Sequence, residues 1–155
     1  MSFRITGIDA AQFEHLFGLS DEDLARHRAR RYVVEETGGY PCRVTLEDAA
    51  PGERLLLVPY RHQPCATAYA SEGPIFVRER RATRAEWNDE VPDQFKARLI
   101  SLRAYDRSDM MIDADVVDGK ELKPLIERFL ADDNTAYLHA HFARRGCFAG
   151  RIDRR

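Results

Sequence analysis

The spacing of hydrophobic residues changes near residue 32, and this change divides the chain into a short helical part and a longer part made of strands. In the first part, Asp9 followed three residues later by Gln12 has the form of a capping box, and Ser20 precedes an acidic first turn. Both signals are typical of helix N-termini. The sequence therefore predicts a strand over residues 3–5, a helix over 9–18 and a helix from 21 to about 29.

Beyond residue 32, short runs of apolar and β-branched residues alternate with turn compositions such as Thr37-Gly-Gly-Tyr-Pro41 and Glu72-Gly-Pro74. This arrangement is typical of antiparallel strands joined by turns. The predicted strands cover residues 32–34, 43–46, 55–58, 75–77, 99–105 and 110–117, and a final hairpin pairs 136–142 with 147–152. Residues 79–94 have the composition of a loop, residues 94–98 form a short helix, and the apolar stripe over 122–130 predicts a longer one.

These elements predict an α+β fold in a single domain spanning residues 1–155. We expect a mostly antiparallel, curved sheet of about six to eight strands, with about three helices packed against it. The composition agrees with a globular domain, because 44% of the residues are hydrophobic and 32% are charged.

Charge and cysteine content restrict the class of protein further. The three cysteines are an odd number at irregular spacing, and the first residues lack the pattern of a signal peptide, which predicts a cytoplasmic protein with reduced thiols. No apolar run approaches the length of about 20 residues that a membrane span needs. A net charge of −2 argues against binding to nucleic acid or to an anionic membrane. Of the 24 basic residues 21 are arginine, which suits an anionic ligand but also follows from a GC-rich coding sequence.

Polar and ionisable side chains alternate with apolar ones along the predicted strands 99–105, 110–117 and 136–142, so each of these strands has one polar face. If these strands are neighbours, their polar residues share one surface. The residues of this predicted surface are Arg103, Tyr105, Asp113, Asp115, His139 and His141. Two interpretations remain open: the surface is a site for acid–base chemistry or anion binding, or it is the solvated face of a half-buried sheet.

Cysteines and further arginines extend the candidate site. His139 or His141 is a candidate general base, and Cys147 or Cys42 a candidate nucleophile, although either cysteine can equally be a small buried hydrophobe. Guanidinium groups suited to an anionic substrate belong to Arg43, Arg103 and Arg144. The His-x-His pair can chelate a metal ion with a carboxylate such as Asp113, but no complete metal motif is present, so we predict neither a metal nor another cofactor.

Five short motifs connect the chain with a known family. They are Gly39-Tyr-Pro-Cys-Arg43, Pro51-Gly-Glu53 leading into Leu55-Leu-Leu, Gly73-Pro-Ile-Phe-Val-Arg78, Leu102-Arg-Ala-Tyr105 and His139-x-His141-x-Ala-Arg-Arg-Gly-Cys147. With these motifs the chain resembles the bacterial family catalogued as domain of unknown function 1203. The resemblance extends from about Phe13 to Arg154 and implies one intact domain. It implies no activity, ligand or cofactor.

Two functional hypotheses follow from the residues themselves. In the first, the protein uses the histidines, arginines and cysteines at a site for a small anionic molecule, with or without catalysis. In the second, it is a non-catalytic binding or protein-interaction module whose cysteines are structural. The exposed strand edges leave a homodimer open without arguing for it.

Overall fold

The computed structural model describes residues 1–155, and its strands form two antiparallel sheets. The larger sheet contains β1 (Phe3–Thr6), β5 (Glu86–Asn88), β6 (Leu99–Tyr105), β7 (Met111–Asp118), β8 (Tyr137–Phe142) and β9 (Phe148–Arg154). Its strand order is β5-β1-β9-β8-β6-β7, so the first and last strands of the chain are neighbours near its centre.

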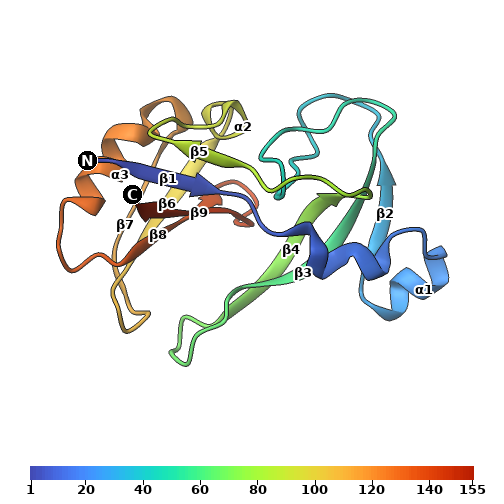
Figure 1. Cartoon of the computed structure of the whole chain (residues 1–155), viewed down its shortest axis with the longest axis horizontal. Helices are drawn as coiled ribbons and strands as arrows, with labels where there is room; N and C mark the ends of the chain where they lie inside the picture. Colours follow the sequence, from blue (N-terminus) through green and yellow to red (C-terminus); the bar gives the residue numbers. More distant parts are fainter.

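The smaller sheet contains β2 (Arg30–Val33), β3 (Arg54–Gln63) and β4 (Ser71–Arg78), in that order. Figure 1 shows the two sheets as neighbouring lobes, with β3 and β4 forming a long hairpin that extends beyond the rest of its sheet. Two short helices lie beside the smaller sheet: the 3-10 helix η1 (Ala10–Leu16) and the α-helix α1 (Asp21–Arg26).

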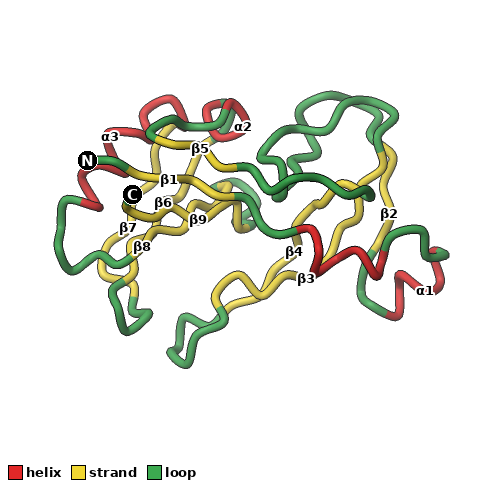
Figure 2. The backbone as a smooth tube through the Cα atoms, in the orientation of Figure 1, coloured by secondary structure: helices red, strands yellow, loops and turns green.

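The remaining helices lie against the larger sheet (Figure 2). They are α2 (Asp93–Lys96), the 3-10 helix η2 (Gly119–Glu121) and α3 (Leu122–Leu130). The apolar stripe of α3 is buried as the sequence predicts, because its residues at helical spacing face the sheet. None of the helices combines the length and the apolar character that crossing a membrane requires.

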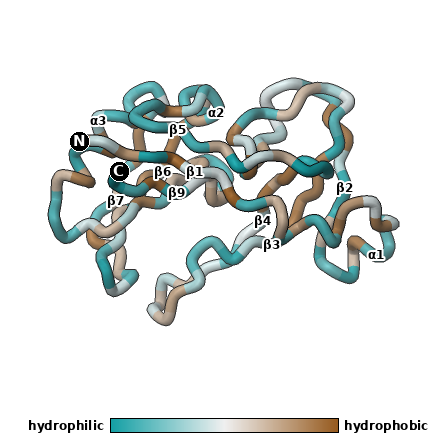
Figure 3. Tube along the Cα trace, viewed as in Figure 1, coloured by the Kyte–Doolittle hydropathy of each residue, from teal (hydrophilic) through white to brown (hydrophobic).

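Each lobe has its own apolar core. The core of the larger sheet includes Phe3, Phe95, Leu102 and Ile126, and the core of the smaller sheet includes Leu24, Leu56 and Ile75. Phe148 of β9 belongs to the second core although its strand lies in the first sheet, so it joins the two lobes. Figure 3 shows hydrophobic residues concentrated along the strands, whereas the turns are mostly hydrophilic.

The α+β class and the antiparallel pairing are confirmed, and most predicted strands are present. Three local predictions are wrong in whole or in part. The segment 43–46 is a turn, in which Leu46 adopts a left-handed φ of 55° and its N–H donates to Cys42 O at 3.1 Å. The helix after Asp9 is present and Asp9 is its N-cap, but it is a 3-10 helix that ends at Leu16 rather than at residue 18. The predicted loop contains β5, a strand of three residues. A strand of three residues is too short to show an alternating pattern in the sequence. It is recognised as a strand only through its pairing with β1.

Candidate functional site

The polar faces of β6 and β8 do lie on one surface. In the sheet register, Arg103 is opposite His139, Ser101 is opposite His141, and Tyr105 is opposite Tyr137. Directly opposed residues share a face, so the predicted grouping of Arg103, Tyr105, His139 and His141 is confirmed. The neighbouring strand β9 adds Arg151 and Phe148 to this face.

The histidines of this face are buried, because the end of β3 covers them. The ring of His62 lies 5.0 Å from that of His141 and stacks on Phe148 with centroids 5.3 Å apart. His139 is 2% exposed and His141 is 1% exposed. The interpretation of these histidines as part of a solvated sheet face is therefore wrong.

The two buried histidines are neutral over the physiological pH range. Burial, reinforced by nearby cationic groups, lowers the pKa of His139 and of His141 to about 3. The Nδ1 atom of His141 lies 2.9 Å from Gly146 O, so we assign the ring proton to Nδ1, which donates to this carbonyl. The Nε2 atom is then an acceptor and faces Arg103 Nη1 at 3.5 Å.

Asp113 and Asp115 do not belong to this face, so that part of the prediction is wrong. The register of β7 places Asp113 opposite Ala104 and Asp115 opposite Leu102, on the apolar side of β6. The carboxylate of Asp115 pairs with Arg128 of α3 at 3.3 Å, on the side where that helix lies. Because β7 is an edge strand with both faces partly exposed, its alternation of apolar and acidic residues does not mark the buried side.

Neither candidate cysteine forms a hydrogen bond with His139 or His141. Cys42 is fully buried in the core of the smaller sheet, as expected for a small hydrophobe. Cys147 is partly exposed in the turn between β8 and β9. The ring nitrogens of His141 contact Gly146 and Arg103 rather than either thiol, and the structure contains no group of three His, Cys, Asp or Glu side chains placed to ligate a metal ion.

A cleft of about 660 Å³ opens between the two lobes, around the turn that joins β8 to β9. Figure 1 shows this turn, in red, near the centre of the molecule. The lining comes from the glycine-rich loop before Arg43, the edge strand β4, the segment between α2 and β6, and the turn itself. Its charged residues and its thiol are Arg43, Arg98, Asp118, Arg144, Arg145 and Cys147. Four arginines against one aspartate leave an excess of three positive charges.

Arg43 is the innermost of these arginines and has no carboxylate partner. Its side chain is 3% exposed, Nε donates to Phe148 O at 2.7 Å, and Nη1 donates to Pro41 O at 2.6 Å. The Nη2 group makes no hydrogen bond within the chain. Unlike the fully buried unpaired atoms of the protein, it remains accessible to solvent. Burial lowers the pKa of Arg43 to about 10, although the nearby Cys147 opposes this effect.

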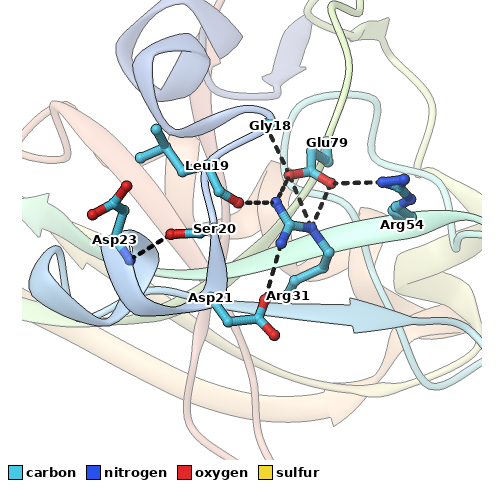
Figure 4. A network of polar contacts seen from close by, with 8 residues as sticks. All are labelled: Gly18, Leu19, Ser20, Asp21, Asp23, Arg31, Arg54 and Glu79. Carbon is cyan, nitrogen blue, oxygen red and sulfur yellow. Dashed lines mark hydrogen bonds and ion pairs between the residues drawn. The ribbon is translucent and has the colours of Figure 1, made fainter.

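Two other well-covered arginines, Arg31 and Arg78, are neutralised by carboxylates, unlike Arg43. Figure 4 shows Arg31, whose Nε donates to Glu79 Oε1 at 2.8 Å and whose Nη1 donates to Asp21 at 3.0 Å. The hydrogen bond to Glu79 raises the pKa of Arg31 above its ordinary value. Arg78 is likewise paired with Glu53 at 3.0 Å. The charge of Arg43 instead faces backbone carbonyls and the cleft.

The remaining arginines of the cleft differ in their partners. Arg98 pairs with Asp48 at 3.0 Å, and its guanidinium lies over the ring of Phe142, which also contacts Arg43. Arg144 and Arg145 are exposed in the turn and form no ion pair. The cleft therefore combines an apolar wall with three guanidinium groups that form no ion pair.

The predicted site residues thus separate into two places. Arg103, Tyr105, His139 and His141 lie in the buried face, whereas Arg43, Arg144 and Cys147 line the cleft. Sequence reasoning missed Arg98 and Phe142, since neither stands in a motif that signals a site. Arg145 was also missed, although the sequence could have indicated it, because it directly follows the predicted Arg144 in a turn where both residues are exposed.

Comparison with known proteins identifies the family and nothing more specific. A family model described as "Protein of unknown function (DUF1203)" matches residues 39–154. The chain therefore belongs to the DUF1203 family, which confirms the resemblance seen in its motifs. No curated protein and no solved structure matches the chain.

Proposed function

We propose that this member of the DUF1203 family binds a small anionic molecule in the cleft between its two lobes, through Arg43, Arg144 and Arg145. The observation that supports the proposal best is the buried guanidinium of Arg43, which has no carboxylate partner and one free Nη2 group at the cleft. A buried charge without a counter-charge is costly, and an anionic ligand supplies the missing partner.

The lining also indicates the kind of anion. A guanidinium binds a carboxylate or phosphate through two parallel hydrogen bonds, so these groups suit the arginines best. Phe76 and Phe142 provide apolar surface in the same cleft. Its volume of about 660 Å³ is within the range of small-molecule sites. The ligand we expect is a metabolite-sized carboxylate or phosphate ester.

The proposal is one of binding, and it leaves a structural role to the histidines. His139 and His141 line no part of the cleft, and burial holds both rings neutral. Two other hollows, of about 390 and 400 Å³, suit a ligand less because they contain almost no apolar lining.

Titration calorimetry with citrate and with pyrophosphate at low ionic strength tests the proposal. We expect binding of at least one of the two, weakened about tenfold or more in the variant R144A/R145A, because two unpaired charges of the cleft are lost. The matched control is R61A/R107A, which removes two exposed arginines outside the cleft that form no ion pair. Equal weakening in both variants would indicate nonspecific attraction to the protein surface, and the proposal would then be wrong.

A further inference from the structure

We infer that Cys147 is the reactive thiol of the cleft and that it exchanges with small disulfides that carry carboxylate groups. The inference rests on the proposed function, because the arginines that hold an anion are those that bring such a disulfide to the thiol. It adds a covalent step and a substrate class to a site so far described only by its charge.

The position of Cys147 distinguishes it from the other two cysteines. It lines the cleft and is partly exposed, directly after Gly146 in the turn. Cys42 is 0% exposed and is closed to reagents in the folded protein. Cys65 is partly exposed, but it lies in the loop between β3 and β4, where its Sγ is 3.2 Å from Thr67 Oγ1. Only Cys147 is both accessible to solvent and located in the cleft lined by arginines.

Arg43 provides independent evidence that the space beside Cys147 receives a ligand. The side chain is nearly fully buried, and its Nη2 group has no partner in the chain. Arg43 and Cys147 both line the cleft, so one small molecule bound there can contact both groups. Arg144 and Arg145 precede the thiol by three and two residues in the sequence and form no ion pair.

The reaction needs no oxidant other than the disulfide itself. Cys147 loses its proton to solvent, and the thiolate attacks one sulfur of the disulfide. A new sulfur–sulfur bond forms between Cys147 and one half of the reagent as the original bond breaks, and the other half leaves as a thiolate. The protein sulfur is oxidised and the departing half is reduced. The arginines raise the rate by attracting the anionic reagent and by stabilising the negative charge that develops on the leaving sulfur.

Two disulfide reagents, one anionic and one uncharged, test the inference. Dithiobis(nitrobenzoate) has a carboxylate on each half, whereas dithiodipyridine is uncharged at neutral pH. The rate with the first divided by the rate with the second cancels the intrinsic reactivity of the thiol. The variant C65S reports Cys147 alone and the variant C147S reports Cys65 alone, because Cys42 is buried.

We expect the rate ratio of Cys147 to exceed that of Cys65 by about tenfold or more at low ionic strength. The variant C65S/R144A/R145A should lower the ratio of Cys147 towards that of Cys65, while C65S/R61A/R107A should not. Equal ratios at the two cysteines would overturn the inference, as would an unchanged ratio after removal of both arginines of the turn.

Citrate and pyrophosphate titrations of the same variants separate this inference from the proposed function. If an anion binds in the cleft and the two cysteines have equal ratios, the exchange reaction is wrong and the binding proposal stands. If no anion binds and the ratios are equal, both are wrong. If Cys147 is selectively labelled by the anionic reagent and citrate slows that labelling but not the labelling of Cys65, both are supported.

Discussion

Mild acid should destabilise this fold strongly, because two buried histidines are neutral in the folded state and become protonated in the unfolded chain. Burial lowers the pKa of His139 and of His141 from 6.5 to about 3. A base whose pKa falls on folding gives full stability above its unfolded pKa and loses it as the pH decreases towards the folded value. The loss should therefore begin near the unfolded pKa of 6.5 and continue towards about 3.

The size of the effect follows from the two pKa values. At about pH 5 the folded state binds almost no proton at either ring, whereas the unfolded chain binds nearly one at each. Over the roughly 1.5 pH units below the unfolded pKa, each histidine then removes about 2 kcal/mol from the free energy of unfolding, and the pair about 4 kcal/mol. Domains of this size have about 5–15 kcal/mol in total, so the loss is a large fraction of the stability.

Urea denaturation at a series of pH values measures this loss, with the fluorescence of the single tryptophan, Trp87, as the probe. The variant H141N retains a donor for Gly146 O and removes one titrating ring, so its free energy of unfolding should depend on pH about half as steeply. The variant H27N removes an exposed histidine and should leave the slope unchanged. A wild-type loss below about 1 kcal/mol between about pH 7.5 and about pH 5, or equal slopes in H141N and wild type, would refute the reasoning.

Two further substitutions test the packing within each lobe. Gly119→Ala should lower the free energy of unfolding by more than about 2 kcal/mol, because the added Cβ would lie 1.8 Å from a backbone oxygen of α2. The control is Gly39→Ala, which has open space around it and should change the free energy of unfolding by less than about 0.5 kcal/mol. Similar values for the two variants would contradict the close approach of Gly119 to α2. Arg31→Met should cost about 3 kcal/mol in urea denaturation, because it leaves the carboxylate of Glu79 buried without its partner. The exposed pair of Arg26 supplies the control, and Arg26→Met should cost less than about 1 kcal/mol; an equal cost for the two would contradict the burial of Glu79.

Alternation along β6 and β8 was sufficient to place His139 and His141 on the face that carries Arg103. Alternation depends only on the pleat of each strand, so it can be read locally once the strands are assumed to pair. The same reasoning failed at Asp113. β7 is an edge strand, and an edge strand lacks the burial that links an apolar pattern to the core.

The histidine face and the cleft both depend on contacts between distant parts of the chain. His62 of β3 closes the histidine face from another sheet, and nothing in the local sequence of either segment indicates the other. The cleft is similar, since Arg43, Arg98 and Arg144 come from three separate segments. In the sequence, none of these arginines stands out from the many others in the chain. Arg98 is paired with Asp48 whereas Arg43 and Arg144 form no ion pair, and this difference becomes visible only when the positions of the carboxylates are also known.

The sequence by itself determined the α+β class, most of the strands, the buried stripe of α3 and the family to which the chain belongs. These properties follow from side-chain periodicity, capping and short motifs, which involve residues close together in the chain. Only the tertiary structure decided that the chain forms two sheets, that the histidine face is covered, and that the arginines meet in a cleft with Cys147. Burial and charge pairing depend on which distant segments pack together, and many arrangements of the same strands satisfy the same local pattern.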